Sequence, residues 1–233
     1  VLTSEMLLFL MQPNNRVILE LEEAKARLGW DQLPRPILSM HVRHGKTKHE
    51  GGFIPLQRYV QTALVAKAKY GFKSLFIFTD SKQVLEDVAQ LTSHFTIAAW
   101  DYPKFTQTSF KQKHDTFSQL RMGRATGCEE ALPILINIYL AIEAQGFVGV
   151  FMSNIDRVIA RMAYVIRSPE ERRNTPLWSV SKWPQVGFDI VTRDSMVVST
   201  VEHDGEFMAI EAVHQHDMNA TTRVGMILDS STQ

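Results

Sequence analysis

SLFIFTDSKQVLEDVAQL, residues 74–91, contains a buried strand and the helix that follows it directly. Its first part, residues 74–80, is a continuous apolar run of the kind found in strands that are covered on both faces of a parallel sheet. Its second part, residues 81–91, returns apolar side chains every three or four positions, which predicts a helix. The stretch is therefore one strand-helix unit of an α/β protein.

The same unit precedes this stretch. Residues 36–43, PILSMHVR, are apolar and rich in β-formers, which predicts a strand. Residues 55–71 restore helical spacing, with proline at the start and glycine at the end, where each residue favours a helix boundary. The predicted order from residue 36 to residue 91 is strand, helix, strand, helix.

The alternation of strands and helices continues after residue 91. Residues 94–100 predict a third strand, and the polar, aperiodic residues 101–127 predict a long functional loop. A helix over 128–146, a short buried strand over 147–152 and a helix over 153–168 with Ser153 as its N-cap then follow. This pattern predicts a Rossmann-like parallel sheet with helices on both faces.

Three regions are expected along the chain. Residues 1–34 read as a helical lead-in, and because the chain begins at Val1 inside a helical pattern, we expect an upstream domain before it. Residues 35–185 carry the Rossmann-like pattern. Residues 186–233 predict a short β-rich C-terminal segment, with strands joined by turns over 188–213, and a weakly patterned tail from His214 onward.

The composition excludes several classes of partner. The 233 residues are 45% hydrophobic, and 25 Lys and Arg balance 25 Asp and Glu, so no overall field attracts nucleic acid or an acidic membrane surface. Any anion site must therefore be local. The single cysteine, Cys128, excludes an internal disulfide, and no apolar run is long enough to cross a membrane.

Candidate site residues lie where the predicted strands end. Ligands of open parallel sheets bind at the carboxyl ends of the strands, where helix N-termini and loop amides converge. That rule selects Arg43 to Glu50, Thr79 to Ser81, the loop around His114, and Ser153 with Asn154. An arginine fork beside a helix N-terminus suits a phosphorylated ligand, although a surface ion pair for Arg43 and a plain N-cap for Ser153 are the structural alternatives.

The motif Arg43-His44-Gly45 has two readings. In a histidine phosphatase, His44 is the nucleophile, and the family also needs a second histidine late in the chain and further arginines that hold the phosphate. His203 could imitate the late histidine, but residues 79–90 contain no arginine. In the other reading, Arg43 clamps the diphosphate of a nucleotide sugar.

Four motifs in the same order and spacing resemble the α1,6-fucosyltransferase family, which includes N-glycan core and nodulation-factor enzymes. They are HVRHG (41–45), LFIFTDSKQVLEDVAQL (75–91), MGRATGCEEALPILINIYLA (122–141) and FMSNIDRVIARMAY (151–164). The resemblance implies the donor-binding half of a GT-B glycosyltransferase. Such an enzyme is expected to move fucose from GDP-fucose, with inversion, to a glycan or glycoprotein acceptor, through an α1,6 linkage to N-acetylglucosamine.

The resemblance also implies roles for single residues that would bind the donor. Arg43 matches the arginine on the donor β-phosphate, and His41 matches the histidine that lines the guanosine site. His44 stands where vertebrate members have a second arginine. Asp80 and Ser81 fall on the second motif, below the donor. Ser153 matches the serine at the diphosphate, with Asn154 in the next position.

Two further positions concern catalysis and base recognition. Glu50 matches the proposed catalytic base with a loop one residue shorter, and Lys46 or Lys48 matches the lysine near it; a solvated loop carboxylate is the alternative for Glu50. Asn137 replaces an aspartate that recognises the guanine edge, and an amide cannot pair as strongly with the two guanine donors. Loss of turnover would leave a non-catalytic GDP-sugar-binding module.

We expect that the protein needs no cofactor and no metal ion. No Asp-X-Asp sequence is present, which removes the usual carboxylate pair for a metal-bound nucleotide sugar, in agreement with a metal-independent family. A eukaryotic relative is expected in the Golgi lumen as part of a type II membrane protein, with its anchor upstream and no membrane contact from this segment. A bacterial relative is expected in the cytoplasm.

Overall fold

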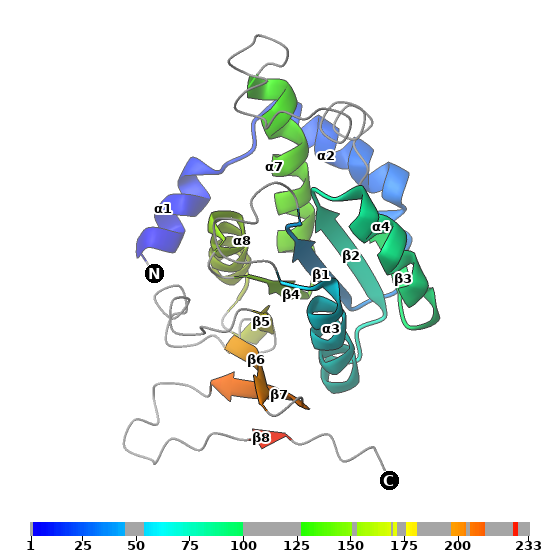
Figure 1. Ribbon diagram of the computed structural model, residues 1–233. Helices are drawn as coiled ribbons and strands as arrows, with labels where there is room; N and C mark the ends of the chain where they lie inside the picture. The colour runs from blue at the N-terminus through cyan, green and yellow to red at the C-terminus, as the bar shows by residue number, and fades with distance from the viewer. Residues whose placement is uncertain are drawn as a thin grey trace.

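The fold was determined as a computed structural model, which describes residues 2–44, 54–99, 127–150, 153–168, 170–171, 176–180, 197–203, 206–212 and 226–227. One sheet organises these residues, in the order β3-β2-β1-β4-β5-β6-β7-β8 (Figure 1). Its strands are β1 (Ile37–Val42), β2 (Ser74–Thr79), β3 (Thr96–Ala99), β4 (Gly146–Gly149), β5 (Leu177–Ser179), β6 (Val197–His203), β7 (Glu206–Ala212) and β8 (Met226–Ile227).

The strands from β3 to β6 in this order pair in parallel, and β7 and β8 continue the sheet as antiparallel strands. The predicted α/β class with a parallel sheet is therefore confirmed. The strands of the C-terminal segment extend the same sheet, because β6 pairs with β5. Within the described ranges, no helix combines the length and apolar composition that a membrane span requires.

Helices cover both faces of the sheet, as predicted (Figure 1). One face packs against α2, α7 and α8, and the other packs against α3, α4 and η2. The strands alternate accordingly: Ile37 of β1 points to the first group, and Leu38, Met40 and Val42 point to the second. The helices are α1 (Leu2–Leu10), α2 (Asn15–Leu28), η1 (Trp30–Gln32), α3 (Leu56–Tyr70), α4 (Lys82–Val88), η2 (Ala89–Ser93), α7 (Gly127–Glu143) and α8 (Asn154–Val165).

The helix ends follow local sequence signals. The Asn14 Oδ1 atom accepts a hydrogen bond from the Val17 N–H at 3.0 Å and caps α2. Gly29 and Gly71 end α2 and α3 at φ values of 59° and 70°, in the left-handed region that glycine adopts without strain. The prediction that a glycine ends the helix over 55–71 is therefore confirmed by Gly71.

Several elements are shorter than predicted, and two of them show how the chain leaves its regular structure. The helix predicted over 81–91 is α helical only as far as Val88 and continues as the 3-10 helix η2. The strand predicted over 147–152 ends at Gly149, because the N–H of Val150 donates to the Asp156 side chain at 2.6 Å instead of continuing the strand ladder. This early exit directs the chain from β4 into α8.

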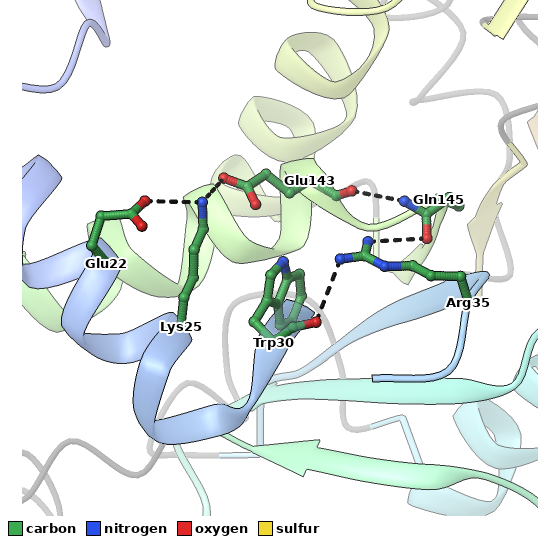
Figure 2. A network of polar contacts seen from close by, with 6 residues as sticks. All are labelled: Glu22, Lys25, Trp30, Arg35, Glu143 and Gln145. Atoms are coloured by element: carbon green, nitrogen blue, oxygen red, sulfur yellow. Dashed lines mark hydrogen bonds and ion pairs between the residues drawn. The ribbon is translucent and has the colours of Figure 1, made fainter. Parts of the chain in front are cut away.

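A polar network joins α2 to α7 at the edge of the sheet where β1 begins (Figure 2). The Lys25 ammonium lies 3.2 Å from Glu22 and 2.7 Å from Glu143. Partial burial favours the neutral amine, but the hydrogen bonds and charges of Glu143 and Glu22 outweigh it and raise the pKa of Lys25. Lys25 therefore stays charged and links the two helices.

Gln145 extends this network to β1 (Figure 2). Its amide oxygen accepts from the Ile37 N–H at 2.8 Å, and its amide nitrogen donates to the Glu143 carbonyl at 3.1 Å. The Arg35 guanidinium approaches the Gln145 oxygen at 3.5 Å and the Trp30 carbonyl at 3.4 Å. These contacts fix the position of α7 along the direction of β1. They therefore also fix how near each α7 side chain lies to the carboxyl end of that strand.

Arg167 is expected to stabilise the protein through the ends of two helices. Its guanidinium donates to the Ile142 carbonyl at 2.8 Å and also to the Ala144 and Ala163 carbonyls, near the C-termini of α7 and α8. Burial lowers its pKa to about 10, so the guanidinium is still charged at neutral pH. Arg167→Met keeps most of the apolar stem, loses these donors, and should lower the free energy of unfolding by about 2 kcal/mol in urea titrations.

Arg161→Met provides the matched control for this prediction. Arg161 is a partly exposed arginine of α8, the helix that ends just before Arg167, so its substitution should change stability by less than about 0.5 kcal/mol. Equal effects of the two variants would show that the carbonyl contacts of Arg167 contribute nothing specific.

Candidate functional site

The carboxyl ends of β1 and β4 form the topological switch point of the sheet. From β1 the chain passes to β2 and then β3 on one side, and it returns to β4 on the other side of β1. The connections after β1 and β4 therefore leave in different directions, and ligands of open α/β sheets bind in the crevice that this creates. Arg43 follows β1 and Ser153 follows β4, so both belong to this edge.

The strand register brings Arg43 and Asp80 to the same level. Val42 lies opposite Thr79, so the next residue of each strand lies at the carboxyl edge. The Arg43 side chain is exposed there. The Asp80 carboxylate accepts a hydrogen bond from the His44 N–H at 3.0 Å and so fixes the turn after β1. The Ser81 N–H donates to Thr79 Oγ1 at 3.1 Å, which forms the corresponding turn after β2.

His44 points to the protein itself. Its Nε2 atom lies 2.7 Å from the Ile54 carbonyl oxygen, and its ring meets the Tyr59 ring edge-on with centroids 6.2 Å apart. A carbonyl oxygen only accepts hydrogen bonds, so Nε2 carries the proton and has no lone pair for attack on phosphorus. His203 ends β6, three strands from β1, which separates the strands by about 14 Å. His44 and His203 are thus not placed as the paired histidines of a phosphatase.

His41 is buried at the same edge, on the face covered by α7 and α8. It is 4% exposed, and its ring stacks on Phe78 of β2 with centroids 4.4 Å apart. Its Nδ1 atom contacts Oδ1 of Asp156, which is 1% exposed and lies in the first turn of α8. The second oxygen of Asp156 accepts from the Val150 N–H. His41 therefore has a protein partner in Asp156, which the prediction of a guanosine contact did not include.

Asp156 was not predicted from the sequence, although a signal for it existed. Asp156, Ile159, Ala160 and Ala163 follow the helical spacing of the buried stripe of α8. An acidic residue at a buried position of such a stripe needs a partner, because an unpaired buried charge is costly. The sequence did not indicate that the partner is His41, 115 residues earlier.

Tyr59 is another buried polar residue near this edge. Burial, together with the charges of Asp156 and Asp80, raises its pKa well above the usual range for a phenol. Tyr59 is 1% exposed, packs its ring against His44 and therefore stays neutral. It acts as packing under the turn after β1 rather than as an acid or base.

Ser153 occupies the predicted N-cap position of α8 but does not cap the helix. Among the described residues, its side chain makes no capping hydrogen bond and its buried Oγ atom has no hydrogen-bond partner. The predicted N-cap position of Ser153 is therefore confirmed, but the expected hydrogen bond from its side chain to the helix is not. The Asn154 side chain contacts the Arg157 guanidinium within α8. Ser153 thus places a hydroxyl and the N-terminus of α8 at the switch point.

Asn137 lies on α7, on the face that holds His41. The Ser39 hydroxyl donates to the Ala141 carbonyl at 3.1 Å, which fixes the level of α7 against β1. Asn137 is one turn nearer the carboxyl edge, about 6 Å along the helix, and so near the level of His41. It is 7% exposed; its Nδ2 atom donates to the Pro133 carbonyl at 2.9 Å, and its Oδ1 atom has no hydrogen-bond partner in the described structure.

Several predicted residues lie outside the described part of the chain. Glu50, Lys46 and Lys48 fall in residues 45–53, and the loop around His114 falls in residues 101–126. His44 and Ile54, which flank the first of these segments, are in contact. Arg43, Asp80 and Ser153 are thus brought to one edge of the sheet, with His41 and Asn137 beneath it.

No protein-family model and no curated protein matches the sequence. Solved structures are similar to it. NodZ α-1,6-fucosyltransferase co-crystallised with GDP is 16% identical, with 85% of this chain and 48% of that chain covered and a TM-score of 0.42. POFUT1 in complex with GDP is 13% identical, with 70% and 46% covered and a TM-score of 0.41.

The fucosyltransferase NodZ from Bradyrhizobium is 18% identical to this chain. The similarity covers 63% of this chain and 42% of that chain, with a TM-score of 0.40. The chain therefore spans less than half of the length of each of these solved structures.

Proposed function

We propose that this chain is the donor-binding half of a fucosyltransferase that uses GDP-fucose. The observation that carries the proposal is the arrangement of the switch point. An exposed arginine, Arg43, follows β1, and the N-terminus of α8 follows β4, with a Ser153 Oγ atom that has no hydrogen-bond partner among the described residues. An arginine fork opposite free helix amides matches a diphosphate. The four motifs that resemble the α1,6-fucosyltransferases include both residues.

The remaining polar groups suit the nucleoside. In the proposed complex, Arg43 binds the β-phosphate, and Ser153 with the first amides of α8 binds the other phosphate oxygens. The guanine lies toward Asn137, whose Oδ1 atom is a hydrogen-bond acceptor without a partner in the described structure. Asp80 and Ser81 hold the turns on which the diphosphate rests, and His44 fixes the turn from below.

The proposed reaction is an inverting transfer. The acceptor hydroxyl attacks the anomeric carbon of fucose from the face opposite the diphosphate, the bond from that carbon to the β-phosphate oxygen breaks, and GDP leaves. The hydroxyl proton passes to a base, for which we propose Glu50, with Lys48 beside it. Arg43 and the amides of α8 stabilise the charge that develops on GDP, so no metal ion is proposed.

The acceptor half, the linkage and the location belong to this proposal as well. We propose a glycan acceptor, an α1,6 linkage to N-acetylglucosamine, and an upstream domain that supplies most acceptor contacts. The proposed location is the Golgi lumen for a eukaryotic protein and the cytoplasm for a bacterial one.

Calorimetric titration with GDP, without divalent metal, tests the donor site. The wild-type chain should bind, and Arg43→Ala should weaken binding about a hundredfold, because a bidentate charge-assisted pair is worth about 3 kcal/mol. Arg27→Ala is the control, since Arg27 is an exposed arginine of α2 that forms an ion pair with Glu23. Equal binding by all three proteins would refute the role of Arg43.

Other outcomes separate the alternative functions. A folded wild-type chain that does not bind GDP would overturn the donor site. Covalent phosphohistidine at His44 would favour the phosphatase instead. GDP binding without fucose transfer, measured with the full-length protein and a glycan acceptor, would favour a non-catalytic binding module, for which the single acceptor that Asn137 presents is the motivating observation.

A further inference from the structure

The Asp156 carboxylate joins three elements at the switch point. It belongs to the first turn of α8, its Oδ1 atom contacts His41 of β1, and its Oδ2 atom accepts from the Val150 N–H, directly after β4, at 2.6 Å. Asp156, His41 and Val150 each lie within three residues of Arg43 or Ser153. The carboxylate therefore sets how the end of β1 and the start of α8 face each other.

The chain around Asp156 leaves room for this carboxylate. A Cβ atom placed on Gly149 would lie 2.9 Å from Oδ2 of Asp156 and 2.6 Å from the Phe147 ring. The final residue of β4 is therefore a glycine where the carboxylate approaches the backbone. Asp156 is 1% exposed, so its contacts are not shared with bulk water.

These contacts determine where the proton of His41 lies. An ionised carboxylate only accepts hydrogen bonds, so the Nδ1 atom that contacts Asp156 must donate. The tautomer of an imidazole is set by the hydrogen bond that one ring nitrogen makes. Nδ1 therefore carries a proton, and in the neutral ring Nε2 is left as an acceptor.

We infer that Asp156 is a positioning residue, which fixes the Nδ1–H tautomer of His41 and holds the N-terminus of α8 against β1. Through these two effects it shapes the crevice between Arg43 and Ser153. Its consequence for nucleotide binding rests on the proposed function, whereas its effect on His41 does not. Asp156 itself is not expected to contact the ligand.

The substitution Asp156→Asn separates shape from proton acceptance. Asparagine has nearly the same shape but only one acceptor oxygen. The Val150 N–H can only donate, so it should take that oxygen, and the amide NH₂ should then face Nδ1 of His41. Nδ1 must accept in this arrangement, so the ring proton should move to Nε2.

Nitrogen-15 NMR of the histidine rings in the full chain measures this directly, without ligand. In the wild type, His41 should show a proton bonded to Nδ1; in Asp156→Asn it should be on Nε2. Asp87→Asn is the matched control, because Asp87 is an exposed aspartate of α4 that accepts from Gln83 at 2.8 Å, and it should leave His41 unchanged. A wild-type ring with its only proton on Nε2 would overturn the inference, even if Asp156→Asn failed to fold.

The binding consequence is tested with GDP as the probe. Asp156→Asn should weaken GDP binding about tenfold while Asp87→Asn binds as the wild type does. Unchanged binding by Asp156→Asn, together with a moved proton, would refute the claim that the crevice depends on Asp156. Absence of GDP binding by the wild type would overturn the proposed function, and the ring spectra would still decide the role of Asp156.

Discussion

Trp30→Ala should lower the free energy of unfolding by about 4 kcal/mol, because it truncates a large, fully buried side chain. Trp30 is 1% exposed and packs edge-on against Phe76 of β2, with ring centroids 5.3 Å apart. The Arg35 guanidinium lies 5.8 Å from the centre of the indole (Figure 2). Truncation removes these contacts and leaves a cavity under α2 and α7. Urea unfolding followed by circular dichroism measures the loss.

Trp30→Phe separates the contribution of ring packing from that of the indole nitrogen. The buried Nε1 atom of Trp30 has no hydrogen-bond partner in the described structure. A buried donor without a partner costs about 1–3 kcal/mol, so phenylalanine loses some volume but also removes this cost. We expect a net loss below about 1.5 kcal/mol, with the contact to Phe76 retained. Equal destabilisation by alanine and phenylalanine would show that the indole N–H is satisfied in solution.

Asp156→Ala should destabilise the protein by about 3–5 kcal/mol. Removal of one member of a buried pair leaves the other without a partner in a dry environment. Here two donors are affected, His41 Nδ1 and the Val150 N–H, which both lose their acceptor. The exposed Asp87→Ala should cost less than about 0.5 kcal/mol and serves as the control.

A double-mutant cycle attributes this loss to the pair. If Asp156 stabilises the fold through His41, the effects of Asp156→Ala and His41→Ala should be less than additive by at least about 1 kcal/mol. Additive effects would mean that Asp156 acts through Val150 alone. The measurement is again urea unfolding, with each single variant and the double variant compared at one pH.

Much of the backbone could be predicted from local patterns. The continuous apolar run of residues 74–80 became β2, and the helical spacing before Gly71 became α3. Apolar periodicity and helix-ending glycines act over a few residues, so they are legible without knowledge of the rest of the chain. The rule that ligands bind at the carboxyl ends of parallel strands also predicts Arg43, Asp80 and Ser153 at one edge of the sheet, where the fold places them.

The tertiary structure decided which side chains meet. His41 was predicted as a ligand contact, and the fold pairs it with Asp156 of α8, 115 residues later in the chain; the His44 ring contacts the Ile54 carbonyl. Such contacts depend on the register between strands and on the height of α7 and α8 against them, which crossovers and core packing set together. The periodicity of a sequence predicts the face of a helix or strand on which a residue lies. Its contact with a residue more than a hundred positions away is determined only when the helices pack against the sheet.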